Sequence, residues 1–140
     1  MDAIAISRTG LDVEWQRLQV IAQNLANINT SRTASGEPFH PLRLLSGPQV
    51  DFAHLVQAGD KVPGGVEVLG LEPMAAGTRR VHEPGHPHAD ADGFVTYPDV
   101  DHASEMTLLI KTSRAYEANL TAMSIAQQMY SRAAELGKQA

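Results

Sequence analysis

The sequence contains no cysteine among its 140 residues, and only 5% of its side chains are aromatic. Without cysteine, neither a disulfide nor a thiolate metal site is possible. The shortage of aromatic rings leaves a core of Leu, Ile, Val, Met and Ala, which suits seams between helices better than the interior of a thick β-sandwich. No apolar run approaches the roughly 18 residues that a membrane-spanning helix needs. The length is that of one ordinary domain.

The net charge of −5 is concentrated in the middle of the chain. Residues 1–30 carry two basic and three acidic side chains, residues 31–102 carry five and ten, and residues 103–140 carry four and three. Because no part is strongly basic, binding to nucleic acid is not expected. Charged side chains, among them Asp2, Arg8 and Asp12, interrupt any apolar run near the start. We therefore expect no cleaved signal peptide.

Residues 3–29 have the pattern of an amphipathic helix. Their apolar positions repeat every seven residues, with two companions three positions further along: Ile4, Leu11, Leu18 and Leu25, then Ile21 and Ile28. This period is typical of a helix that supercoils against another helix. Asn27, Asn29 and Thr30 supply turn-forming side chains that end it. We expect Asn24 and Asn27 to form hydrogen bonds at this helix end.

Residues 103–137 form a second, longer predicted helix, with Ser104 as its N-cap and Gly137 as its stop. A first apolar row keeps a spacing of three or four residues and includes Leu109, Tyr116, Leu120 and Met123. A second row lies along another face: Ala118, Ala122, Ile125, Met129, Ala133 and Leu136. A helix that is apolar on two faces is either buried inside its own chain or covered by other chains. Because no further helix is predicted, other copies or relatives of this chain are the natural cover.

Residues 31–102 differ in kind, since they hold all eight prolines and nine of the eleven glycines. Short apolar runs at 42–45, 66–71 and 94–97 predict strands, two of them preceded by glycine turns. The expected fold is therefore mainly α with a small β part. The N- and C-terminal helices (1–30 and 103–140) pair as a coiled-coil-like hairpin, and a short, irregular, β-rich region (31–102) lies between them in the sequence.

The histidines and aspartates of residues 82–92 could be read as a metal site. The candidate ligands are His82, His86, His88, Asp90 and Asp92. Imidazole and carboxylate groups at short spacing can bind zinc or manganese. However, the prolines at 84 and 87 exclude a helix that would hold two histidines on one face, and the oxygen ligands of a complete calcium loop are absent. The segment therefore favours a turn, in which Asp, Gly and Pro set the backbone angles.

Catalysis has no better support. The sequence has no glycine-rich phosphate loop and no nucleophile elbow, and Tyr116 and Glu117 have no partner base in view. No enzyme activity, cofactor or small-molecule substrate is expected. Two alternatives stay open from the residues alone, namely a small soluble module that binds metal through its histidines and a helical-hairpin adaptor.

Three stretches resemble the axial proteins of the bacterial flagellum, which form its rod, hook and filament junction. Residues 22–30, AQNLANINT, resemble the Asn-Leu-Ala-Asn motif that closes the N-terminal helix. Residues 82–101, HEPGHPHADADGFVTYPDVD, resemble a segment typical of proximal rod subunits, with Phe94 and Asp99 where tyrosine and asparagine are common. Residues 104–123 resemble the opening of the C-terminal helix. The matching positions are Asn24, Leu25, Ala26, Asn27, Pro84, Gly85, His86, Pro87, Gly93, Pro98, Arg114, Tyr116, Glu117 and Asn119.

This resemblance implies a structural subunit that stacks helically to build the proximal rod of the flagellar basal body, in the periplasmic space. It implies four kinds of partner: other proximal and distal rod subunits, the adaptor between rod and membrane ring, copies of the same chain, and the flagellar type III export apparatus. The residues expected to form the subunit packing are Ile4, Leu11, Leu18, Ile21, Leu25, Ile28, Leu109, Tyr116, Leu120, Met123, Ile125, Met129 and Leu136.

Overall fold

The computed structural model describes residues 3–49, 56 and 64–139. In these described residues, two helices flank four short strands in the order α1 (Ala3–Ala26), β1 (Leu42–Pro48), β2 (Val66–Pro73), β3 (Thr78–His82), β4 (Phe94–Pro98) and α3 (His102–Gln139). The expectation of a mainly helical fold with a small β part is confirmed, and the strands pair antiparallel. None of these helices is long and apolar enough to span a membrane.

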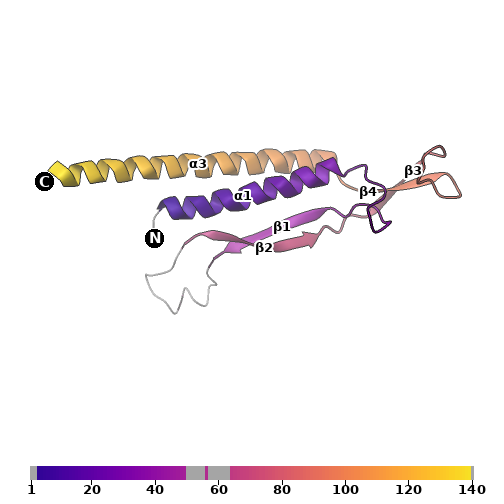
Figure 1. The fold of residues 1–140 in the computed structure, drawn as a ribbon, viewed down its shortest axis with the longest axis horizontal. Coiled ribbons are helices and arrows are strands. Elements are labelled where there is room, and N and C mark those ends of the chain that lie inside the picture. The colour runs from indigo at the N-terminus through magenta and orange to yellow at the C-terminus, as the bar shows by residue number, and fades with distance from the viewer. Residues whose placement is uncertain (1–2, 50–55, 57–63, 140) are drawn as a thin grey trace.

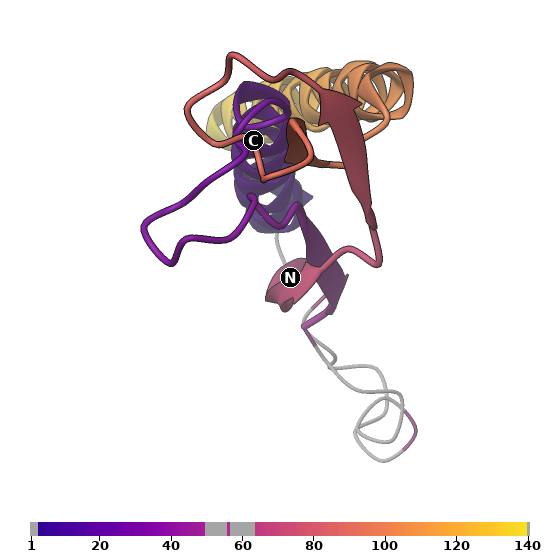
Figure 2. The same ribbon diagram turned by 90° about the vertical axis from the view of Figure 1, so that its right-hand side faces the viewer.

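The two helices run antiparallel along the length of an elongated molecule (Figure 1). The α1 helix packs against α3 on one side and against the β1–β2 hairpin on the other. Seen along the long axis, α1 lies between these two neighbours (Figure 2). The β3–β4 hairpin extends from the end of the molecule where α3 begins (Figure 1).

The sheet side of α1 carries the main hydrophobic cluster. Val13 and Val20 of α1 are buried against Leu44 of β1, with Leu42 and Val68 packed around them. These two valines lie outside the seven-residue repeat of α1, which alone predicted a single apolar stripe. The α1 helix is therefore apolar on two sides, because α3 packs against one side and the β1–β2 hairpin packs against the other.

Within the part of the chain that the structure describes, the strands form two separate two-stranded antiparallel sheets, β1–β2 and β3–β4. Strand β3 was not predicted, because two arginines stand in its centre. They are accommodated by aromatic partners across the hairpin, with the Arg79 guanidinium 5.1 Å from the Tyr97 ring centroid and that of Arg80 4.6 Å from the Phe94 ring centroid. Cation–π contacts of this kind stabilise exposed hairpins.

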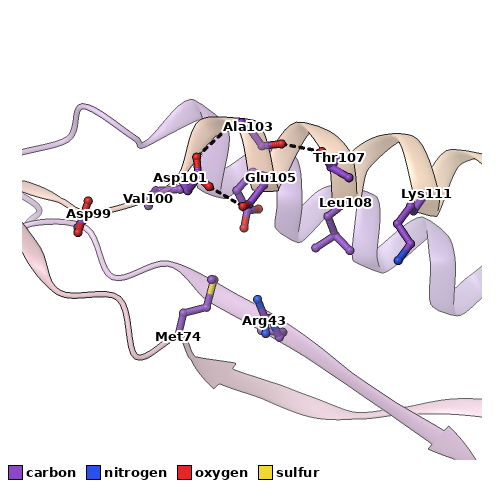
Figure 3. A pocket seen from close by; sticks show the side chains of 11 residues that line it. Arg43, Met74, Asp99, Val100, Asp101, Ala103, Glu105, Thr107, Leu108 and Lys111 are labelled. Carbon is purple, nitrogen blue, oxygen red and sulfur yellow. Dashed lines mark hydrogen bonds between the residues drawn. The ribbon is translucent and has the colours of Figure 1, made fainter.

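The C-terminal helix spans nearly the predicted range, but the residues predicted to begin and end it, Ser104 and Gly137, are wrong. The N-cap is Asp101 and not Ser104 (Figure 3): the Asp101 carboxylate accepts hydrogen bonds from the Ala103 N–H (3.2 Å) and the Ser104 hydroxyl (2.5 Å), and its carbonyl accepts the Glu105 N–H. At the other end the helix continues past Gly137 to Gln139. Glycine ends a helix by adopting positive φ, and Gly137 is not among the positive-φ glycines.

Candidate functional site

Asn24 joins the first helix to the first strand. Its side chain is only 2% exposed. The Asn24 Nδ2 donates to the Leu42 carbonyl oxygen (2.9 Å), and its Oδ1 accepts the Leu42 N–H (3.0 Å). One side-chain amide thus satisfies both backbone groups of Leu42, as a neighbouring strand would. This pair of hydrogen bonds fixes where β1 begins on the surface of α1.

The same amide also reaches the second helix. Asn24 Nδ2 lies 3.3 Å from Oε2 of Glu105, whose side chain is 3% exposed in the first turn of α3. A carboxylate is favoured at a helix N-terminus by the helix dipole, and a buried one needs hydrogen-bond donors. Asn24 therefore brings together α1, β1 and α3, and we refer to Asn24, Leu42 and Glu105 as the junction.

Asn27, the second asparagine of the same motif, has a local role. Its Nδ2 donates to the Gln23 carbonyl oxygen (2.9 Å), and its Oδ1 accepts the Thr30 hydroxyl (3.0 Å). These bonds satisfy groups in the last turn of α1 and in the turn that follows. The two asparagines of one short motif thus have different roles: Asn24 forms hydrogen bonds with β1 and α3, whereas those of Asn27 are local.

A second close contact joins the helices nearer their middle. Gly10 is buried on α1, and a Cβ atom added there would lie 2.7 Å from Oδ1 of Asn119 on α3. The Asn119 Nδ2 donates to the Ala115 carbonyl oxygen (3.0 Å), which holds the side chain in place. The missing side chain of Gly10 therefore makes room for Asn119. Sequence reasoning missed Gly10 because a glycine within a helical pattern gives no apolar signal.

The residues expected to form the N-terminal seam are buried to different extents. Ile21 is fully buried, whereas five are half-buried: Ile4, Leu11, Leu18, Leu25 and Ile28. Leu11 lines a surface hollow of about 430 Å³ together with Trp15, Tyr116 and Met123. The Trp15 and Tyr116 rings are tilted with centroids 6.3 Å apart, and Trp15 is half exposed. Leu11 and Trp15 of α1 thus meet the first apolar row of α3 at the surface.

The residues expected to form the C-terminal seam divide between the two rows. Leu109, Tyr116 and Met123 are half-buried. Leu120, also of the first row, is 46% exposed, and Ile125, Met129 and Leu136 of the second row are 52%, 67% and 69% exposed. The alanines of the second row, at 118, 122 and 133, are exposed as well. The second row of α3 is therefore left uncovered by the chain's own described residues.

The histidine-rich segment forms a hydrogen-bonded turn between β3 and β4. The His86 N–H donates to the Glu83 carbonyl oxygen (3.0 Å), and the His88 N–H donates to Nδ1 of His86 (3.0 Å). His88 Nδ1 also hydrogen-bonds the hydroxyl of Ser31 (2.8 Å). Gly93 has a φ of 80°, which favours glycine and closes the turn. Among the described residues, no group of three or more His, Asp or Glu side chains is placed to hold a metal ion.

The charged residues of this turn form hydrogen bonds within the β3–β4 hairpin. Asp90 Oδ1 accepts the N–H groups of Asp92 and Phe94, and its Oδ2 accepts a bond from Arg80. The hydrogen bond from the Phe94 N–H is the main reason that the pKa of Asp90 lies below its ordinary value. The Tyr97 hydroxyl donates to Glu83 (2.9 Å), which raises the pKa of that phenol. Three of the candidate ligands, His86, His88 and Asp90, thus use their side chains in hydrogen bonds of the turn.

Known proteins match this chain over most of its length. The family model described as "Flagellar basal body rod FlgEFG protein C-terminal" matches residues 91–136, which cover β4 and most of α3. Flagellar basal-body rod protein FlgC of Borreliella burgdorferi is 32% identical over 91% of both chains. FlgC of Salmonella typhimurium is 33% identical over 95% of this chain and 94% of the relative. FlgC of Bacillus subtilis is 31% identical over 97% of both.

The chain belongs to the FlgC family of flagellar basal-body rod proteins. Membership of the FlgC family makes it a structural component of the flagellar basal-body rod, and the metal-binding and adaptor alternatives are not favoured. Its fold suits that role, since the long helix ends in a segment with no cover of its own.

The remaining motif positions of this FlgC-family chain lie around the hairpin and along α3. Pro98 is fully buried where β4 ends, next to the start of α3. Pro84, Gly85 and Pro87 are exposed in the turn. Arg114 and Glu117 are exposed on α3, and Ala26 is exposed at the end of α1. Their exposure leaves these positions available to neighbouring molecules.

Proposed function

We propose that this chain is a subunit of the proximal rod, the drive shaft that carries torque from the membrane ring to the distal rod and hook. The observation that carries the proposal is that large apolar side chains of both rows of α3 are exposed along an elongated, mainly helical chain: Leu120 in the first row, and Ile125, Met129 and Leu136 in the second. A helix with an uncovered apolar face needs a partner. Contacts between different faces of identical or related subunits that do not close into a ring give a helical tube.

Specific partners follow from the same proposal. They are other proximal and distal rod subunits, the adaptor between the rod and the membrane ring, and copies of this chain. The chain would reach the periplasmic space through the flagellar type III export apparatus, without a cleaved signal peptide. No catalysis, cofactor, nucleic acid or small-molecule substrate is part of the proposal.

Packing of the exposed apolar side chains of α3 against neighbouring subunits supplies the energy and the stiffness that a shaft requires. Each large apolar side chain that becomes fully buried contributes about 1.5–3 kcal/mol. Leu120, Ile125, Met129 and Leu136 are all at least 46% exposed before assembly, so several such contributions are available at each subunit. Close-packed side chains deform little, which is the property that transmits torque.

The substitution Leu120→Asp tests this function. Leu120 is 46% exposed, so the chain itself should still fold and be expressed. A carboxylate buried in a subunit contact has no donor and opposes assembly by several kcal/mol. We expect loss of rod assembly and of swimming with unchanged expression. Gln128→Asp, at an exposed polar position of the same helix, is the matched control and should swim. Normal swimming of Leu120→Asp would contradict the proposal.

A further inference from the structure

We propose that a histidine clasp holds the turn between β3 and β4 against the loop after α1, and that protonation opens it. The clasp consists of His86, His88 and Ser31, and we call residues 83–93 the tip turn. The proposal concerns the folded chain on its own, so its test does not depend on the rod function proposed above.

The β3–β4 hairpin is attached through a loop. No other helix or strand packs against β3 or β4 in the part of the chain that the structure describes. Two side-chain hydrogen bonds instead join the hairpin to the loop after α1. The Arg79 guanidinium of β3 donates to Oδ1 of Asn29 (3.1 Å), and Nδ1 of His88 in the tip turn hydrogen-bonds the Ser31 hydroxyl (2.8 Å).

The bond between His88 and Ser31 determines the position of the tip turn rather than that of the strands. Val95 and Tyr97 of β4 are buried, which keeps the strands in place. Every residue of the tip turn, by contrast, is exposed or half-buried. A segment with so little burial opens easily once its hydrogen bonds are lost.

His86 holds His88 in position. The His88 N–H donates to Nδ1 of His86 (3.0 Å), and the two rings meet edge to face with centroids 5.2 Å apart. Because a backbone N–H can only donate, this Nδ1 accepts, and the ring proton lies on Nε2. The His86 N–H in turn donates to the Glu83 carbonyl oxygen, next to the end of β3. The closed clasp therefore requires neutral His86.

Protonation of His86 breaks this arrangement. The added proton on Nδ1 faces the His88 N–H across 3.0 Å, so two donors oppose each other and the hydrogen bond is lost. His88 then lacks the contact that holds it near Ser31. Protonation of His88 itself has no such effect, because its Nδ1–H would still donate to the Ser31 hydroxyl oxygen. His86 is thus the proton-sensitive residue of the clasp.

The groups that face His86 come from the turn and from both strands. The ring of His88 lies beside it, and the Tyr97 ring of β4 stands edge to face at 6.3 Å between centroids. The Glu83 carboxylate accepts the Tyr97 hydroxyl (2.9 Å), and the Arg79 guanidinium lies 5.1 Å from the centroid of the same ring. Both of these charges are therefore engaged with Tyr97.

The other ionisable groups nearby keep their charge in mild acid. The pKa of Asp90 is lowered, chiefly by the hydrogen bond from the Phe94 N–H, so this carboxylate stays ionised. The bond to Glu83 raises the pKa of Tyr97, so the phenol stays neutral. Histidine is the side chain that changes its charge between about pH 7.5 and 5. Acidification over this range is therefore expected to open the clasp.

Opening the clasp changes what the tip turn presents to other molecules. Pro84, Gly85 and Pro87 of the family motif are exposed in this turn. With the clasp closed, these positions are fixed relative to the loop after α1. With the clasp open, they are free to move, while β3 and β4 stay paired.

The distance between two spin labels tests the clasp, and the absence of cysteine allows both labels to be placed by substitution. Ala91→Cys in the tip turn and Ala118→Cys on α3 are at exposed positions. In the full-length chain, double electron–electron resonance should give a narrow distance distribution at about pH 7.5 and one about twofold broader at about pH 5. An unchanged distribution, or a broadening accompanied by loss of helix in far-ultraviolet circular dichroism, would overturn the proposal.

Substitutions of His86 in the labelled chain separate the clasp from a merely structural role. His86→Asn supplies an amide oxygen that accepts the same N–H, as asparagine does in turns, and it cannot be protonated. Its distribution should stay narrow at both pH values. His86→Phe keeps a ring but has no acceptor, so its distribution should be broad at both.

His40→Asn is the matched control, because His40 is an exposed histidine that pairs with Glu37 outside the hairpin. This variant should broaden on acidification as the unaltered chain does. A pH response that persists in His86→Asn would overturn the assignment of His86 as the proton-sensitive residue. A narrow distribution for His86→Phe at about pH 7.5 would show that the acceptor is not needed, and it would overturn the clasp itself.

Discussion

Replacing Asn24 with alanine should destabilise the fold far more than the position of this residue near a helix end suggests from the sequence alone. The substitution removes two hydrogen bonds to Leu42, at 2.9 and 3.0 Å, and one at 3.3 Å to the buried Glu105 carboxylate. Leaving a buried polar group without its partner costs about 1–3 kcal/mol. Leu42 is half-buried, so we take about 1 kcal/mol for each of its groups and about 2 kcal/mol for the carboxylate.

The expected loss in the free energy of unfolding is therefore about 4 kcal/mol, a large share of the roughly 5–15 kcal/mol of an ordinary domain. Urea unfolding followed by far-ultraviolet circular dichroism measures it. Asn27→Ala is the matched control from the same motif, because its bonds are local, and it should cost about 1 kcal/mol or less. Equal losses for the two variants would refute the assignment of Asn24 as the residue that joins α1, β1 and α3.

Two further predictions concern contacts of α3, one with α1 and one with its own N-cap. Gly10→Ala should lower the free energy of unfolding by about 1–2 kcal/mol, because the new methyl group would lie 2.7 Å from Asn119 Oδ1. Combining it with Asn119→Ala should recover most of that loss, and additive losses in urea unfolding would contradict the close contact. The hydroxyl of Ser104 lowers the pKa of Asp101 below its ordinary 3.8. The folded state thus favours the ionised cap, whose contribution is complete above 3.8 and is lost as the pH falls through the lowered pKa. Between about pH 5 and 3, the melting temperature of Asp101→Asn should therefore change less than that of the unaltered chain, and parallel curves would refute this role.

The helical pairing and most of the strands could be predicted because their signals are local. The seven-residue repeat from Ile4 to Leu25 identifies α1, and paired glycines before Val66 identify the start of β2. The second face of α1 could not be predicted, since Val13 and Val20 acquire meaning only when a hairpin lies against them. Strand β3 was missed for the same reason, because Arg79 is stabilised by a ring on a strand far along the chain.

The packing residues divide in the same way. Periodicity identified the first row of α3 and the second row as apolar, and the structure places the second row on the surface. Periodicity gave no means to find Gly10 or Glu105, because the importance of each depends on a contact with a residue far away in the sequence. The polar partner of Asn24 in particular has no sequence signal, since a single glutamate in a first helical turn is ordinary.

The hydrogen bond between Asn24 and Glu105 joins residues 81 positions apart. An N-terminal fragment that stops before residue 105 has neither this bond nor the α3 helix that packs against α1. A chain delivered into a compartment from its N-terminus consequently cannot complete its fold until three quarters of it has arrived. Long-range contacts of this kind make folding slow, so the leading part of a chain in transit lacks the contacts that hold α1 against α3 and β1.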